Sequence, residues 1–400
     1  MRSGWPTKTL AEVCEVFADG DWIESKDQSP DGIRLIQTGN IGVGVFKNRG
    51  QKARHVSEDT FKRLRCTEIF EGDCLISRLP EPVGRSCLMP QAGERMITAV
   101  DCSIVRFNPK QLLPEFFNYF SQSCDYLTAV DARTTGTTRK RISRSRLGQT
   151  AIPVPSISEQ RRIVGMLDEE FEGIARAREN AEKNFRNARA LFESHLESIF
   201  TQRGAGWMDT RLEEVGATQT GSTPKTADRD NYGDFIPFVK PADFNRDGSL
   251  DYENHGLTEV GLSQARRVVA ESVLMVCIGA TIGKCGYCDR DIATNQQVNA
   301  LTPHNGVYHK FVYYQMLTED FQRRVLSSAG QATLPIISKS KWGGLTLAIP
   351  STVREQQVIA AELDALRAQT RDLESIYQRK LAALDELKKS LLDQAFTGQL

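Results

Sequence analysis

The chain has 400 residues, of which 40% are hydrophobic and 26% charged, and these ordinary values exclude wholesale disorder and a fibrous protein. Its 51 basic and 51 acidic residues cancel, which excludes a strongly basic protein that coats nucleic acid without specificity. No stretch approaches the roughly 18 uninterrupted apolar residues of a transmembrane helix.

Two features of the chain predict a cytoplasmic protein. The N-terminal residues Met1–Pro6 lack the apolar core of a signal peptide. The nine cysteines are an odd number, scattered through a large chain, and this usage is typical of reduced thiols rather than of a disulfide framework.

Residues 1–155 form the first predicted domain, of mixed helix and strand. Short apolar runs such as Ile33–Ile36 alternate with turn residues and predict strands. The domain holds 22 basic and 18 acidic residues, and the excess lies in one place, between Arg133 and Arg146. The guanidinium groups in this segment can form paired hydrogen bonds with phosphates and with guanine edges. The alternative interpretation is a solvated basic surface without a ligand. The candidate DNA contacts of this segment are Arg133, Thr137, Arg139, Lys140, Arg141, Arg144 and Arg146.

Residues 156–203 and 351–400 are the second and fourth predicted segments, each a long helix. Neither 158–200 nor 354–396 contains proline, and apolar residues recur there at steps of three and four. We expect the helices to pack antiparallel as a coiled-coil-like spacer, and two independent amphipathic helices are the alternative. The predicted packing residues are Ile163, Leu167, Ile174, Phe185 and Phe192 in the first helix, and Ile359, Leu363, Leu366, Leu373, Leu384 and Leu391 in the second.

Residues 204–350 form a second predicted mixed domain, in which a run such as Ser272–Val276 predicts a strand. Polar loops with free backbone N–H donors can bind phosphates. Side-chain amides can hydrogen-bond to adenine. An equally good interpretation is that the amides only hydrogen-bond the end of a strand. The candidate contacts are Thr220, Ser222, Thr223, Lys225, Lys240, Lys284, Asn295, Gln296, Gln297, Lys339 and Lys341, with Arg85 as the first-domain counterpart of Lys284.

The two halves of the chain repeat one another. WPTKTLAEV at Trp5–Val13 returns as WMDTRLEEV at Trp207–Val215, and ISRSRL at Ile142 returns as ISKSKW at Ile337. Ile-Pro followed by Glu-Gln recurs at the start of both long helices. Several matches in the same order indicate a duplication rather than chance.

Catalytic motifs are missing from the sequence. Gly279–Lys284 has one residue too few between its glycines for a phosphate loop, and Cys285 replaces the required Ser or Thr. The single Cys285/Cys288 pair has no second pair with which to hold zinc, so we expect no metal and no cofactor on this chain. We predict that the chain is not an enzyme.

The motifs resemble those of the specificity subunits of type I restriction–modification systems, over essentially the whole chain. The resemblance is carried by Ile152–Pro155 with Glu159-Gln160, by Ala348–Pro350 with Glu355-Gln356, and by the Ala395–Gly398 ending. Thr220–Pro224 and Gly279–Lys284 also fit, whereas Leu79–Arg85 departs from the glycine-rich hairpin.

The resemblance implies a function in recognition. Each mixed domain would be a target-recognition domain reading one part of a bipartite, asymmetric site in double-stranded DNA. The helices would hold two modification subunits, which bind S-adenosylmethionine and methylate adenine, and restriction subunits can join. The alternative is a helical adaptor without DNA specificity.

Overall fold

The computed structural model describes residues 4–136, 140–330 and 334–397. By internal contacts the chain divides into two compact units. The first unit runs to Ala181 and resumes at Arg379, and the second covers Glu182–Gln378. Each unit therefore contains one mixed domain with part of each long helix, and the division differs from the four predicted segments.

Domain 1, which holds β1 to β10, is built on two four-stranded sheets. The first is antiparallel and its strands, in spatial order, are β2 (Cys14–Asp19), β9 (Cys102–Phe107), β6 (Cys74–Ser77) and β7 (Ser86–Leu88). The second contains one parallel pair, β3 with β8, and runs β4 (Arg54–Val56), β3 (Ile33–Ile36), β8 (Met96–Thr98) and β5 (Glu68–Ile69). The predicted strand at Ile33–Ile36 is confirmed as β3, and all four of its residues are buried.

Domain 2, which holds β11 to β20, repeats this architecture strand for strand. Its first sheet runs β12 (Gly216–Thr220), β19 (Val298–Pro303), β16 (Val273–Val276) and β17 (Cys285–Tyr287). Its second runs β14 (Gly256–Leu257), β13 (Tyr232–Val239), β18 (Ile292–Thr294) and β15 (Arg267–Val268). Since every strand has a counterpart ten strands earlier in the same spatial order, the predicted duplication is confirmed.

A two-stranded sheet and short helices complete each domain. The small sheets pair β1 (Thr7–Thr9) with β10 (Ala151–Pro153), and β11 (Met208–Arg211) with β20 (Thr346–Ile349). The helices of domain 1 are α1 (Glu58–Leu64), α2 (Pro114–Phe120), α3 (Cys124–Asp131) and α4 (Arg144–Gly148). Those of domain 2 are α6 (Leu212–Val215), α7 (Glu259–Gln264), α8 (His309–Leu317), α9 (Glu319–Ser328) and α10 (Lys339–Gly343).

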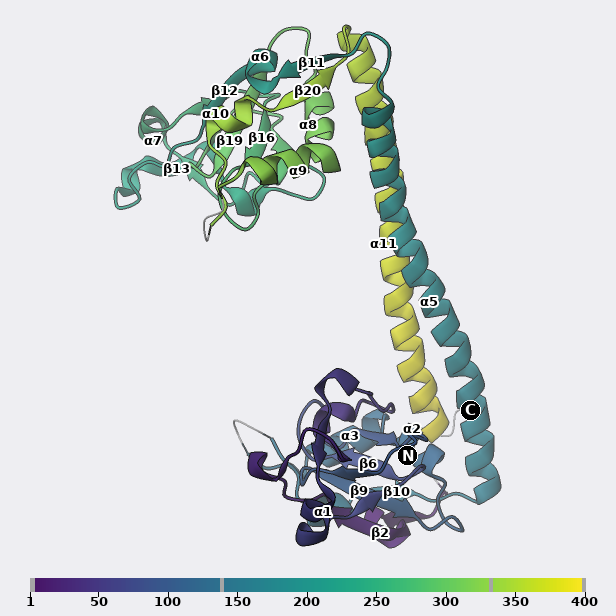
Figure 1. The fold of residues 1–400 in the computed structure, drawn as a ribbon. Coiled ribbons are helices and arrows are strands. Elements are labelled where there is room, and N and C mark those ends of the chain that lie inside the picture. The colour runs from purple at the N-terminus through teal and green to yellow at the C-terminus, as the bar shows by residue number, and fades with distance from the viewer. Residues whose placement is uncertain (1–3, 137–139, 331–333, 398–400) are drawn as a thin grey trace. The chain divides into compact units, whose positions relative to one another are not determined.

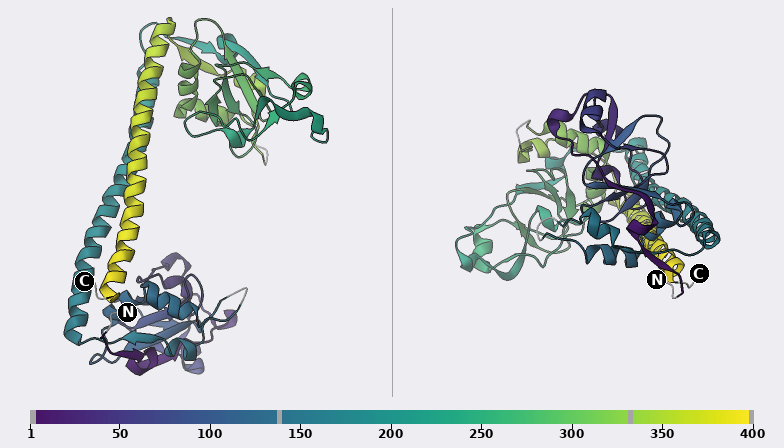
Figure 2. Two further views of the ribbon diagram at one scale, coloured as in Figure 1. Left: turned by 180° about the vertical axis from the view of Figure 1, so that it is seen from behind. Right: turned by 90° about the horizontal axis from the view of Figure 1, so that it is seen from below.

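The two long helices are α5 (Ile157–Gln202) and α11 (Val353–Thr397). Within each unit their segments lie side by side and run in opposite directions (Figures 1 and 2). In the first unit Arg178 pairs with Asp385, and in the second Arg189 pairs with Glu374 at 3.0 Å. The predicted antiparallel pairing therefore holds inside both units.

The seam between the helices differs in part from the predicted stripe. Ile163, Leu167, Phe192 and Leu363 are buried in the domain cores, and Ile174, Phe185, Ile359, Leu366, Leu384 and Leu391 are partly buried. Leu373, however, is 39% exposed, so its predicted packing role is wrong. The seam of α11 repeats every seven residues through Leu363, Thr370, Tyr377, Leu384 and Leu391, which are all buried or partly buried.

Both long helices begin in the same way. The hydroxyl oxygen of Ser156 accepts from the backbone N–H of Glu159, and that of Thr352 accepts from Glu355, as N-cap residues do. One turn in, the buried side chains of Gln160 and Gln356 bond the loop that precedes α2 or α8. The Glu-Gln motif of the sequence thus joins each helix to its domain.

Candidate nucleic-acid interface

In the described part of the predicted basic segment Lys140, Arg141 and Arg144 are exposed, and carboxylates of the same domain lie near all three. Lys140 pairs with Asp131 at 2.8 Å, and Arg141 with Asp101 at 2.7 Å. Arg144 lies 3.9 Å from Asp19, at the edge of ion-pairing distance. These ion pairs reduce the net field that the segment presents to an anion.

The remaining predicted residues of this segment have mixed surroundings. The guanidinium of Arg133 donates to the Ala129 carbonyl oxygen at 2.8 Å, and that of Arg146 to the Arg133 carbonyl oxygen at 3.4 Å. Thr137 and Arg139 lie outside the described residues.

Arg85 has a structural position, which corrects its prediction as a DNA contact. The side chain is only 8% exposed, and burial lowers the pKa of its guanidinium. It donates to the carbonyl oxygens of Ile41, Leu79, Pro82 and Thr38 at 2.7 to 3.0 Å. Because these bonds occupy four of its five N–H donors, Arg85 holds the segment before β7 against the loop after β3. Its counterpart Lys284 is partly exposed.

In domain 2 the structure brings two predicted polar loops together. The hydroxyl of Thr223 donates to the side-chain oxygen of Gln296 at 2.5 Å, and the backbone N–H of Ser222 donates to the Thr294 carbonyl oxygen at 2.9 Å. Thr220 bonds Asn299 through its hydroxyl at 2.8 Å. The loop after β12 therefore lies against the turn between β18 and β19.

The three consecutive amides of that turn do not act alike. Asn295 is 8% exposed and donates to the Gln297 side chain at 2.9 Å, so these two amides brace the turn. Gln296 is exposed and remains the amide best placed to meet a ligand.

The predicted cations of domain 2 are dispersed over several elements. Lys225 and Lys339 are exposed, and Lys341 donates to the Ser328 carbonyl oxygen at 3.2 Å. Lys240 is partly buried, with its ammonium 5.6 Å from the centre of the Phe238 ring.

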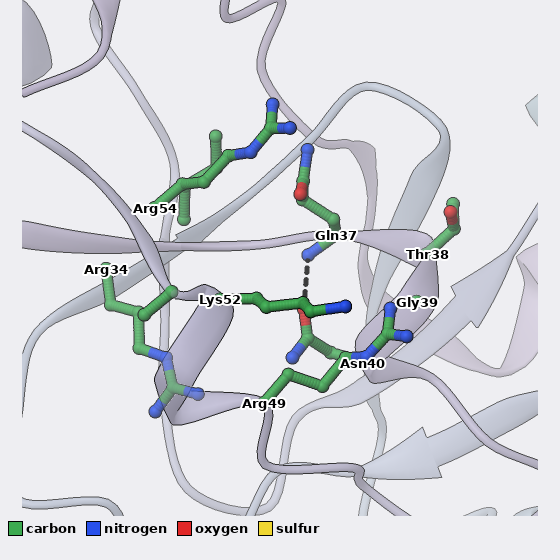
Figure 3. Close-up of a pocket in the computed structure, with 10 residues that line it drawn as sticks. Arg34, Gln37, Thr38, Gly39, Asn40, Arg49, Lys52 and Arg54 are labelled. Atoms are coloured by element: carbon green, nitrogen blue, oxygen red, sulfur yellow. Dashed lines mark hydrogen bonds between the residues drawn. The ribbon is translucent and has the colours of Figure 1, made fainter. Parts of the chain in front are cut away.

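Sequence analysis missed a second basic site, the β3–β4 pocket. This cavity of about 630 Å³ in domain 1 is lined by Arg34, Leu35, Gln37, Thr38, Gly39, Asn40, Arg49, Lys52, Ala53 and Arg54. Figure 3 shows Lys52 and Arg49 reaching across it, with the amide of Gln37 and the guanidinium of Arg54 at one rim. Residues 47–54 hold four basic residues and no acidic one, a denser run than 133–146, so the basic excess does not lie in one place.

The thiols that might have suggested metal chemistry are buried and protonated. Burial raises the pKa of Cys277 to about 12 and that of Cys288 to about 11. The Cys285 thiol donates to the Gly283 carbonyl oxygen. Across the described ranges no cluster of His, Cys, Asp and Glu is arranged to hold a metal ion, and no helix has the length and apolar character to cross a membrane.

The type I restriction modification DNA specificity domain is the family whose model matches this chain. The match covers residues 2–182 and again 205–382, one copy for each half. The chain belongs to this family. The two matched ranges together cover both mixed domains and more than half of each long helix.

Known specificity subunits show the same relationship at low identity. The HindI specificity subunit of Haemophilus influenzae is 24% identical over 49% of this chain and 42% of that protein. The EcoBI specificity subunit of Escherichia coli is 24% identical over 69% of this chain and 64% of that protein. The chain thus spans about two fifths to two thirds of these relatives.

Solved structures support the fold over the whole chain. A chain from a type I R-M system, solved for its complex assembly and conformational transition, has a TM-score of 0.77 at 22% identity and covers 100% of this chain and 99% of its own length. The HsdS subunit from Thermoanaerobacter tengcongensis has a TM-score of 0.61 at 21% identity, with coverage of 100% and 98%. The predicted fold class, two α+β domains with two long helices, is confirmed.

Proposed function

We propose that this chain is the DNA-reading specificity subunit of a type I restriction–modification complex. Each domain contacts one part of a split target in double-stranded DNA, and the chain itself performs no catalysis. The observation that carries the proposal is the duplication: two DNA specificity domains of identical strand order lie in one chain. Their loops differ in sequence and charge, so the two half-sites should differ and the target should be asymmetric.

The proposal extends to partners. Two modification subunits that carry S-adenosylmethionine and methylate adenine would bind the long helices, restriction subunits can join, and the complex would work in the cytoplasm. Apolar side chains on α11 support a protein partner there, since Leu373 is 39% exposed and Ile376 47% exposed. Exposed apolar groups that sit together mark interaction surfaces.

Binding to DNA in increasing salt separates this proposal from a helical adaptor without DNA specificity. We expect the chain, isolated with the subunits that accompany it, to bind its target duplex and to lose about a thousandfold in affinity between 50 and 200 mM salt, as a protein with about six phosphate contacts does. Mapping of methylated bases in host cells with and without the gene identifies the target. The adaptor would be favoured if the chain shows no salt-dependent DNA binding and if removal of the gene leaves every methylation motif in place.

The spacing between half-sites provides a second test. We propose that α5 and α11 set this spacing, so removal of two heptads from each helix should change the gap and leave both half-sites unchanged. Fourteen helical residues rise about 21 Å, which limits the change to about 6 base pairs. Methylation mapping of the variant measures it. If the shortened variant methylates half-sites of different sequence at the original spacing, the helices do not determine the spacing.

A further inference from the structure

The β3–β4 pocket of domain 1 has positive charge that the protein leaves uncompensated. Arg34 is neutralised, because it pairs with Glu94 at 2.7 Å and donates to Asn48 at 2.6 Å. Arg49, Lys52 and Arg54 are exposed, and within the described ranges none of them has a carboxylate at ion-pairing distance. By contrast, Lys140 and Arg141 of the basic segment are both paired.

The guanidinium of Arg49 lies over Gly39 in the pocket. A Cβ atom added to Gly39 would lie 2.2 Å from its Nη1 atom, so the guanidinium occupies the space that a side chain at residue 39 would need. The carboxamide of Gln37 lines the same pocket. Arginine pairs with the O6 and N7 atoms of guanine, and glutamine can pair with adenine.

The equivalent surface of domain 2 has a different lining. Ile33 lies opposite Val56 in the β3–β4 pair, and Ile236 opposite Leu257 in the β13–β14 pair. Counting from these partners, Glu253 occupies the position of Lys52, and His255 that of Arg54. Both residues line a cavity of about 400 Å³ with Asp234, Asn254 and Arg290. The two cavities share the positions 52–54 and 253–255 beside these strands and differ there in charge, as expected of surfaces that read different bases.

We propose that the β3–β4 pocket is the principal DNA-reading surface of domain 1. Lys52 and Arg54 contact phosphates, and Arg49 reads a guanine of the first half-site. The assignment rests on the proposed function, and it places the main contact here rather than on the basic segment at 133–146.

The test compares three variants of the full chain, isolated with its accompanying subunits, on duplexes with an intact or a scrambled first half-site. Arg49→Gln should reduce the preference for the intact half-site by about 5- to 150-fold, the range that one bidentate base contact provides. The double variant Lys52→Gln/Arg54→Gln should weaken binding to both duplexes alike and lower the salt slope by about 1.8, at 0.9 per phosphate contact. Lys140→Gln/Arg141→Gln should lower that slope by less.

Controls make every outcome decisive. Lys26 and Lys62 are exposed cations of the same domain outside the pocket, so Lys26→Gln/Lys62→Gln should bind as wild type. Matching thermal unfolding curves establish that the variants are folded. Wild-type chain that binds no duplex would overturn the proposed function. Wild-type binding with unaltered pocket variants, or a larger slope loss in Lys140→Gln/Arg141→Gln, would overturn the pocket assignment alone.

Discussion

Phe396→Ala should destabilise the first unit by about 3–5 kcal/mol, the usual cost of removing a fully buried phenylalanine side chain. The ring is 1% exposed and packs edge-on against Phe116 and Phe120 of α2, with centroids at 5.4 and 5.2 Å. Hydrogen exchange followed by mass spectrometry resolves the two units. We expect faster exchange in domain 1 and unchanged exchange in domain 2.

Leu387 provides the matched control on the same helix. It is 45% exposed, and Leu387→Ala should change the free energy of unfolding by less than about 1 kcal/mol. Equal effects of the two substitutions, or an effect of Phe396→Ala confined to domain 2, would contradict the view that the end of α11 completes the core of domain 1.

Gln356→Leu should cost the second unit about 1–3 kcal/mol. The side chain is 1% exposed; its amide donates to the carbonyl oxygens of Gly306 and Pro350 at 3.1 and 3.2 Å, and its oxygen accepts from the N–H of Tyr308 at 2.8 Å. Leucine can make none of these bonds, and a buried backbone group left unpaired costs about 1–3 kcal/mol. Chemical denaturation with a domain 2 reporter measures the loss.

The adjacent glutamine controls for the substitution itself. Gln357 is exposed, so Gln357→Leu should shift the free energy of unfolding by no more than about 0.5 kcal/mol. Gln160 makes the same three kinds of bond in the first unit, at 2.8 Å each, and Gln160→Leu should reproduce the loss there. If Gln356→Leu is as stable as Gln357→Leu, water satisfies the backbone groups in place of the amide. In that case Gln356 is not needed to join α11 to domain 2.

The duplication and the long helices were predictable because both leave local patterns in the sequence. Short matches such as WPTKTLAEV with WMDTRLEEV keep their order, and a heptad pattern depends only on spacing. A weaker match has the same order: IRLIQTGNI at Ile33 returns as IPFVKPADF at Ile236. In both, an Asn or Asp side chain, Asn40 or Asp243, accepts from the backbone N–H three residues earlier.

The candidate site was predictable only in part, because its charges depend on partners that lie outside the local run of basic residues. From the sequence, Lys140 and Arg141 are predicted to be unpaired cations. In the folded domain they form ion pairs with Asp131 and Asp101. Arg85 is of a residue type that often contacts DNA, but its surroundings are those of a core residue. Its four acceptors are backbone carbonyl oxygens in 38–41 and 79–82. Arg49, Lys52 and Arg54, by contrast, stand in one short segment that charge counting in a narrower window would have found.

The packing of Phe396 on α2 also affects the order of events during synthesis. Phe116 and Phe120 leave the ribosome about 280 residues before the ring that covers them. At about 5–20 residues per second, their apolar surface stays uncovered for roughly 15–55 s. The second unit, which is continuous from Glu182 to Gln378, has its whole sequence available earlier. Although domain 1 is translated first, its unit is therefore the last that can complete its core, and a nascent chain stalled before α11 should expose the α2 surface to chaperones.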